Sequence, residues 1–266
     1  MSVGMSICSS VLGKDGEMSK KAQVAAPELP PLEIGKYAPS EKDSVRKWVL
    51  YGRSGSGKTY MAGTFPKPLF VDLEGGMASL LPLTKEGREI LRLPAAGPIV
   101  SHADFLDCLD LVEQSLLEGA RFETVVFDSI NQLQYLMALD IVASFDKTRE
   151  YDDQLTRSDY GKLARMMEIA IVRMFSLNCQ VVIVCGTQQQ DASDTIWPAL
   201  IGTKSVPNML RLADAVGYCL SEHVPATATV PEHQLYQVSF SNCAEWVAKL
   251  RGAEVPFLSS NVYPFS

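Results

Sequence analysis

Short apolar segments alternate with segments of helical periodicity along most of the chain, beginning at Arg46. Apolar runs of about four to eight residues are typical of buried strands. Helical spacing covers residues 103–117, and from Tyr160 to Phe175 apolar residues recur at i, i+3, i+4 and i+7. We expect strands at 48–51, 69–72, 124–128, 180–186, 215–220 and 235–240. Strands that alternate with helices predict an α/β fold, a mostly parallel twisted sheet flanked by helices.

The N-terminal segment lacks this alternation. Residues 1–40 contain four prolines, Pro27, Pro30, Pro31 and Pro39, and show little apolar periodicity. Such a composition is typical of a flexible arm. We therefore predict an arm over residues 1–45 and one folded core over residues 46–266. An alternative is that the arm docks on a neighbouring subunit.

Composition excludes several classes of protein. Hydrophobic residues make up 47% of the 266 residues and charged residues 21%, as is usual for globular proteins. The apolar run 181–185 is far shorter than the roughly 20 residues of a membrane-spanning helix, so we expect no membrane association. Residues 1–21 lack the apolar core of a secretory signal. The six cysteines form no C-x-x-C pair, which favours a reduced, cytoplasmic setting.

The net charge bears on binding partners. The formal net charge is −7, whereas proteins that coat nucleic acid through general charge are usually basic. Any binding to nucleic acid must therefore use local basic loops, and it should be strongly sensitive to salt.

The strongest motif for chemistry follows the first predicted strand. The residues Gly52-Arg53-Ser54-Gly55-Ser56-Gly57-Lys58-Thr59 match G-x-x-x-x-G-K-[ST], the P-loop, in full. Glycines allow successive backbone N–H groups to converge on a phosphate, and the N-terminus of the following helix adds positive charge. We expect Lys58 to contact the β- and γ-phosphates of ATP, and the Thr59 hydroxyl to bind Mg²⁺.

Two acidic residues complete the predicted site. Asp128 ends the apolar run 124–128, at the strand edge where ligands of parallel sheets bind, and is the expected second Mg²⁺ ligand. Glu74 follows the strand at 69–72 and can act as general base if it lies near the γ-phosphate. The N-K-x-D tetrapeptide of Ras-type GTPases is absent, and no dense arginine cluster indicates a kinase lid.

Four segments together resemble a known family. The P-loop, the run 66–76 with F-V-D-L-E-G-G, the run 124–129 and Asp159-Tyr160-Gly161-Lys162-Leu163 occur in the order and spacing of phage RecA-like single-strand annealing proteins. These are short AAA-type P-loop ATPases with a minimal RecA core, and the resemblance covers about residues 47–264. It implies that Glu74 is the catalytic glutamate and that Gln188 senses the γ-phosphate. Gln189 or Gln190 could serve instead of Gln188.

The resemblance also indicates contacts with DNA and with a neighbouring subunit. Two loops are candidates for DNA binding: 146–157, with Lys147 and Arg149, and 189–205, with Trp197 and Lys204. Trp197 is the best candidate for stacking on bases, although it could instead close the core beside Pro198. Lys204 fits a DNA phosphate or a neighbour's ATP.

The basic run at 249–252 resembles the K-x-R-x-G element that reaches the nucleotide of an adjacent subunit. By that resemblance Lys249 and Arg251 would contact the neighbour's ATP. The glycine follows Arg251 directly, which departs from the family's spacing. The alternative is a solvated basic turn.

The expected activity is that of a recombination ATPase. The chain would bind single-stranded DNA as a homo-oligomeric ring or filament in the cytoplasm (of the host, if phage-encoded) and hydrolyse ATP, stimulated by DNA, to turn over. A single-strand-binding protein is a further candidate partner. Two alternatives remain: a P-loop ATPase switch acting on a protein client in phage replication or packaging, and a nucleotide-binding structural protein without hydrolysis.

Overall fold

The computed structural model describes residues 46–145, 154–189, 194–201, 205–225, 233–251 and 262–265. The predicted arm, residues 1–45, lies outside them. The elements of the first half are β1 (Lys47–Gly52), α1 (Lys58–Gly63), β2 (Pro68–Asp72), the 3-10 helix η2 (Met77–Leu80), α2 (Leu81–Lys85), β3 (Leu91–Leu93), α3 (His102–Glu118), β4 (Thr124–Asp128) and α4 (Ile130–Phe145). Those of the second half are α5 (Arg157–Phe175), β5 (Gln180–Cys185), β6 (Thr187–Gln189), β7 (Ile196–Pro198), α6 (Ser205–Leu212), β8 (Ala215–Val224), β9 (His233–Ser239), β10 (Lys249–Leu250) and β11 (Val262–Phe265).

One mixed sheet organises these elements. Its strand order is β11-β9-β8-β1-β5-β4-β2-β3, and β10 pairs with β8. The strands from β8 to β3 run parallel, whereas β9, β10 and β11 join antiparallel. The predicted α/β fold with a mostly parallel sheet flanked by helices is therefore confirmed. Within this order β5 lies between β1 and β4, so the P-loop strand and the strand that ends in Asp128 are not neighbours.

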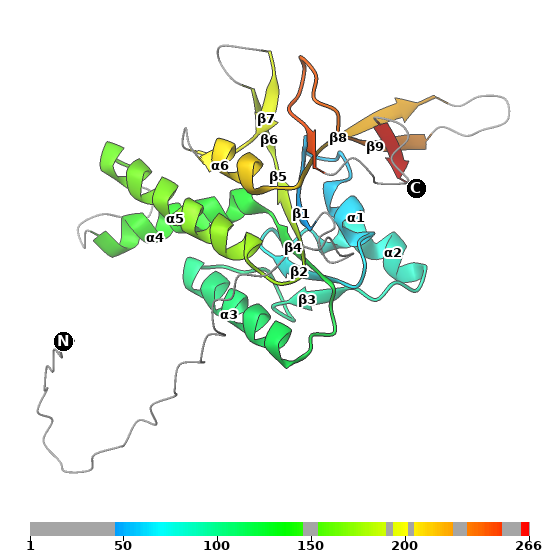
Figure 1. Cartoon of the computed structure of the whole chain (residues 1–266). Helices are drawn as coiled ribbons and strands as arrows, with labels where there is room; N and C mark the ends of the chain where they lie inside the picture. The colour runs from blue at the N-terminus through cyan, green and yellow to red at the C-terminus, as the bar shows by residue number, and fades with distance from the viewer. Residues whose placement is uncertain are drawn as a thin grey trace, which may run out of the picture. The chain divides into compact units, whose positions relative to one another are not determined.

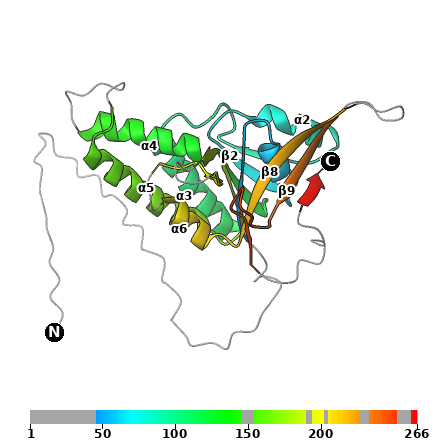
Figure 2. The ribbon, with the colours of Figure 1, turned by 90° about the horizontal axis from the view of Figure 1, so that it is seen from above.

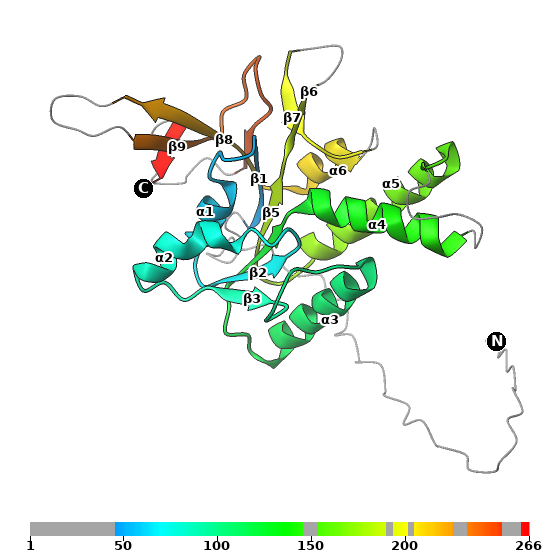
Figure 3. The same ribbon diagram turned by 180° about the vertical axis from the view of Figure 1, so that it is seen from behind.

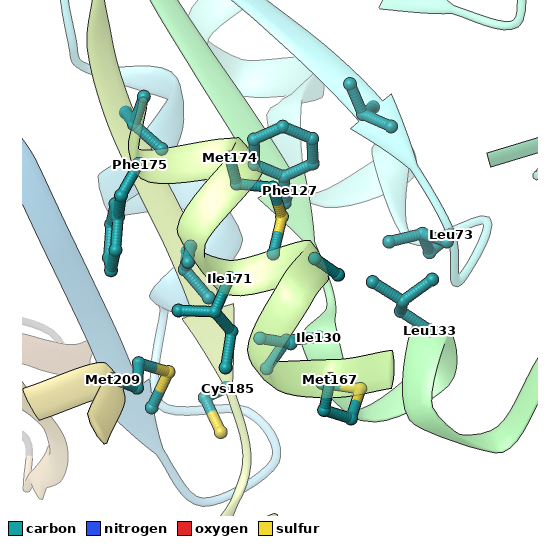
Figure 4. Packing of buried hydrophobic residues seen from close by; sticks show 14 of the residues in the cluster. Leu73, Phe127, Ile130, Leu133, Met167, Ile171, Met174, Phe175, Cys185 and Met209 are labelled. Carbon is teal, nitrogen blue, oxygen red and sulfur yellow. The ribbon is translucent and has the colours of Figure 1, made fainter. Parts of the chain in front are cut away.

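Helices cover both faces of the parallel strands (Figures 1 and 2). Alternate side chains of one strand enter different clusters: Val49 and Tyr51 pack with α3, α4, α5 and α6, whereas Leu50 packs with α1, η2 and α2. Figure 4 shows the first cluster, in which Phe127 of β4 lies near Met174 of α5. Because both faces are buried, all five side chains of β4 are buried, which explains its nearly continuous apolar sequence.

Capping residues fix where the two longest described helices begin. The Ser101 hydroxyl accepts a hydrogen bond from the Asp104 N–H at the start of α3. At the start of α5, Thr156 and Asp159 form a reciprocal capping box. The D-Y-G-K residues therefore occupy the first turns of α5, and the aspartate of that motif caps the start of the helix.

The predicted strands are all present, with bounds that differ by a few residues at most. Elements that the apolar pattern did not indicate include α4, α6 and the β6–β7 hairpin, which extends from the carboxyl end of β5 (Figure 3). Among the described residues no helix combines the length and the apolar character needed to cross a membrane.

Candidate functional site

The P-loop lies at the carboxyl edge of the parallel strands, between β1 and α1. A cavity of about 540 Å³ opens there. It is lined by P-loop residues and by residues that follow β2, β4 and β5. These lining residues include Gly52, Ser54, Gly55, Gly57, Lys58 and Thr59 of the P-loop, together with Glu74, Asp128, Ser129, Asn131, Gly186 and Thr187. Of the predicted P-loop set, Arg53 is exposed and Ser56 is buried, and neither lines the cavity.

Three positions of the loop require glycine, two because of their backbone angles and one because of close packing. Gly55 and Gly57 have φ angles of 76° and 79°, in the left-handed region that favours glycine. At Gly52 a Cβ atom would lie 2.4 Å from the Ser56 Oγ and 2.5 Å from the Cys219 carbonyl oxygen. The buried Ser56 Oγ has no hydrogen-bond partner among the described residues. The loop is therefore tightly packed at Gly52 and Ser56, whereas Gly55 and Gly57 line the cavity.

Lys58 lies across the mouth of the loop. Its Nζ donates to the carbonyl oxygens of Gly52, at 3.0 Å, and Arg53, at 2.8 Å. These contacts hold the ammonium group at the loop, where Lys58 lines the cavity. A polyanion at this position would meet both the cation and the N–H donors.

Thr59 and Asp128 meet at the inner end of the cavity. The Thr59 Oγ1 donates to the Asp128 Oδ2 over 2.7 Å, and Asp128 is only 6% exposed. Burial raises the pKa of Asp128 to about 6; the Thr59 hydrogen bond opposes this rise, and the nearby Glu74 carboxylate adds to it. A cation bound at this pair would remove the cost of the buried charge.

Glu74 reaches the same cavity from the neighbouring strand. The N–H groups of Leu73 and Glu74 both donate to the Asp128 carbonyl oxygen, at 2.8 and 3.2 Å, so the turn after β2 is tied to the end of β4. The Ser129 hydroxyl then donates to the Glu74 Oε1. Glu74 itself is exposed to the cavity. A carboxylate held by one oxygen and open at the other is suited to accept a proton from water.

Asp72, the nearest alternative acid, is already engaged. It is 1% exposed, and its Oδ2 accepts from Arg92 Nε at 3.0 Å and Nη2 at 2.6 Å. Its Oδ1 accepts from the Gly75 N–H at 2.7 Å. Asp72 therefore shapes the turn that carries Glu74 and does not face the cavity.

A family comparison agrees with this site. A family model described as an AAA domain matches residues 44–252, which include every described residue of the P-loop cavity. The chain belongs to this AAA-domain family. It is therefore a P-loop ATPase domain of the AAA type, a class of domain that binds nucleotide. No curated protein matches the chain.

In this AAA domain the predicted γ-phosphate sensor lies beside the P-loop cavity rather than in it. Gln188 is exposed on β6, opposite Trp197 of β7, and lines a neighbouring cavity of about 460 Å³. Asn131, at the start of α4, lines both cavities. The prediction missed Asn131 and Ser129, although both follow Asp128 within three positions. That proximity to the expected Mg²⁺ ligand was the available signal.

The position of Trp197 bears on its two predicted roles, stacking on bases and closing the core. Its ring is half-buried and packs against the core cluster, and its Nε1 is buried without a hydrogen-bond partner among the described residues. These contacts favour the alternative in which Trp197 closes the core beside Pro198. The other predicted DNA contacts, Lys147, Arg149 and Lys204, lie outside the described residues.

Lys249 and Arg251 make contacts within their own subunit. Lys249 Nζ donates to the carbonyl oxygens of Leu210, at 2.7 Å, and Ala213, at 2.6 Å, at the end of α6. Arg251 pairs with Asp214 at 3.5 Å. Because β10 pairs with the first residues of β8, these cations lie at the sheet edge opposite the P-loop. These intrachain contacts favour a structural role, and contact with a neighbour's ATP stays a prediction.

Proposed function

We propose that this AAA domain hydrolyses ATP to control its binding to single-stranded DNA as a homo-oligomer. The observation that carries the hydrolytic part is the position of Glu74, which Ser129 holds at the edge where Lys58, Thr59 and Asp128 meet. A domain that only bound nucleotide would not need a carboxylate oriented toward the phosphates. This geometry therefore favours an ATPase over the structural protein without hydrolysis.

The P-loop residues and Asp128 would bind the phosphates and Mg²⁺ in this proposal. The P-loop N–H groups and Lys58 bind the phosphates. The Thr59 hydroxyl and Asp128 carboxylate are hard oxygen donors 2.7 Å apart, a pair that fits Mg²⁺ with phosphate oxygens and water as its other ligands. Mg²⁺ bound there would neutralise charge on the phosphates. Among the described residues no group of three or more His, Cys, Asp or Glu side chains could hold a metal alone.

The reaction is phosphoryl transfer to water. Glu74 accepts a proton from the attacking water, whose oxygen forms a bond to the γ-phosphorus while the bond to the leaving oxygen of ADP breaks. Ser129 keeps one Glu74 oxygen engaged, so that the other faces the cavity. Positioning and charge supply most of the acceleration in such reactions.

The DNA partner is supported by the resemblance of the four sequence segments and by the connection between the cavity and the β6–β7 hairpin. Gly186, which lines the P-loop cavity, is followed directly by β6, and the predicted loop 189–205 contains β7. A change at the phosphates could thus reach this loop through one strand. The alternative, a protein client, would use the same hairpin and makes the opposite prediction in a DNA titration.

The test combines Glu74→Gln with binding of a labelled single strand. The variant keeps an oxygen for the Ser129 hydroxyl, so it should fold and bind ATP, yet release phosphate at least about 100-fold more slowly. With ATP present its complexes with the single strand should last longer than those of the wild type. Glu86→Gln, the same change at an exposed position outside the cavity, is the matched control.

The outcomes separate the alternatives. Unchanged phosphate release in Glu74→Gln would exclude Glu74 as the base. Normal hydrolysis by the wild type without any ATP-dependent binding of the single strand would favour the protein client. Absent phosphate release by the wild type, with nucleotide bound, would favour the structural protein.

A further inference from the structure

Two carboxamide side chains of α4 hold a backbone segment that belongs to neither sheet. The Asn131 Oδ1 accepts from the Gly186 N–H at 2.7 Å, and its Nδ2 donates to the Ala199 carbonyl oxygen. One turn later, the Gln134 Oε1 accepts from the Ile201 N–H at 2.7 Å, and its Nε2 donates to the Ile201 carbonyl oxygen at 3.0 Å. We call these two side chains and their bonds the carboxamide clamp.

Both side chains of the clamp come from the first turns of α4. Residues three apart lie on one face of a helix, so Asn131 and Gln134 address the segment 199–201 together. Gln134 is only 4% exposed. The Ala199 N–H adds a bond to the Gly186 carbonyl oxygen at 2.9 Å, which ties the segment to the end of β5 as well. The helix thus supplies hydrogen-bond partners for backbone groups of Ala199 and Ile201, which ties the segment to α4.

The carboxamide clamp lies next to the P-loop cavity. Asp128 and Ser129 immediately precede α4, and the first carboxamide of the clamp, Asn131, lines the P-loop cavity. Gly186, its partner, lines the same cavity. By contrast Gln188, the residue predicted to sense the γ-phosphate, is exposed and lines only the neighbouring cavity. One route from the cavity to the segment 199–201 therefore runs through α4, in addition to the bond between Gly186 and Ala199.

We propose that the carboxamide clamp relays the nucleotide state of the P-loop cavity to residues 199–201. Movement of Asp128 or Ser129 on nucleotide binding shifts the first turn of α4, and the clamp moves the segment 199–201 with it. The segment follows β7 and forms one wall of the neighbouring cavity. The relay rests on the proposed binding of ATP at the P-loop, and it names Asn131 and Gln134 as positioning residues for the partner-binding side of the molecule.

Amide hydrogen exchange of the full chain tests the relay. Peptides that contain residues 199–201 are compared with and without a non-hydrolysable ATP analogue and Mg²⁺, and a fluorescent ATP analogue measures nucleotide affinity in parallel. In the wild type we expect nucleotide to change the exchange rate of these amides by at least about fivefold, the lower end of typical coupling between sites. Local opening of the segment is what the exchange rate reports.

Gln134→Glu is the decisive variant. It keeps the oxygen that accepts from the Ile201 N–H but replaces the donor to the Ile201 carbonyl oxygen with a carboxylate oxygen, which repels it. The nucleotide-dependent change in exchange should fall below about twofold, while affinity for the fluorescent analogue stays within about threefold of the wild type, since a broken coupling need not alter the intrinsic site. Gln132→Glu makes the same chemical change two residues before Gln134, at a position that takes no part in the clamp bonds, and should respond like the wild type.

The possible results differ in meaning. A variant that merely loosened the segment would exchange faster with and without nucleotide, and its nucleotide-dependent ratio would persist; that result overturns the relay. A wild type that binds the analogue without any change at 199–201 overturns the relay alone. A wild type that binds no analogue overturns the proposed function and the relay with it. If thermal melting shows Gln134→Glu to be unfolded, Gln134→Met, which removes both bonds to Ile201 without adding a charge, is read by the same criteria.

Discussion

The buried carboxylate of Asp128 should make the stability of the free protein depend on pH in an unusual direction. Its pKa is raised from 3.8 to about 6, chiefly by burial. Between those two values the folded state holds a proton that the unfolded state has lost. The free energy of unfolding therefore falls as pH rises through this window, and each pKa unit contributes about 1.36 kcal/mol. A shift of about two units corresponds to about 3 kcal/mol in total.

Asp128→Asn removes the titrating group and provides the test. Relative to the wild type, the variant should gain about 3 kcal/mol in free energy of unfolding between pH 4 and pH 7. Urea unfolding at several pH values, without nucleotide or Mg²⁺, measures this difference. Asp107→Asn, the same change at an exposed position of α3, controls for the altered net charge. A difference that stays flat, or that grows as pH falls, would refute the assignment of a costly buried charge to Asp128.

The remaining predictions concern three basic residues. Lys58→Ala should abolish binding of a fluorescent ATP analogue, because the cation over the P-loop carbonyl oxygens is lost; near wild-type affinity would contradict the P-loop assignment. Arg92→Lys should lower kcat for ATP hydrolysis about 10- to 100-fold with little change in KM, because the paired contacts to Asp72 that shape the turn carrying Glu74 are lost; steady-state kinetics measures this, and a change confined to KM would count against a positioning role. Lys249→Met should lower the free energy of unfolding by about 1–3 kcal/mol, because carbonyl oxygens at the end of α6 lose a charged donor, without changing hydrolysis per folded molecule; lost hydrolysis that is restored by mixing with Lys58→Ala subunits would instead support contact with a neighbour's ATP.

The fold could be predicted where burial on both faces leaves a continuous apolar run. Such runs gave β1, β4 and β5 to within a residue or two of their ends. The helix α4 escaped because its sequence, INQLQYLMALDIVASF, is apolar around most of its circumference and lacks a distinct polar face. The strands β3 and β10 are three and two residues long, too short for any periodicity to register.

The site could be predicted only where one local motif carries the chemistry. The P-loop is contiguous, and its glycines have the backbone angles that its function requires. The role of Lys249 depends on where the end of α6 lies, and that of Asn131 on the return of the chain at Ala199, which is 68 residues away. No local sequence pattern indicates either of these long-range contacts. The contacts of Lys249 and Asn131 depend on long-range packing, which the sequence alone does not reveal.

The register of the central strands explains why Glu74 and Asp128, which come from separate segments, line the same cavity. Asp72 of β2 lies opposite Asp128 of β4, so Glu74 and Ser129 emerge side by side just beyond the paired ends. A slip of β2 by two residues would keep the same side chains facing the same cores, yet it would move Glu74 about 7 Å along the strand and out of reach of Ser129. The core clusters on the two faces, which fit specific side chains rather than a pattern, oppose that slip. The packing of β2 thus sets the position of the proposed catalytic base, and substitutions of its buried side chains should reduce hydrolysis before they unfold the protein.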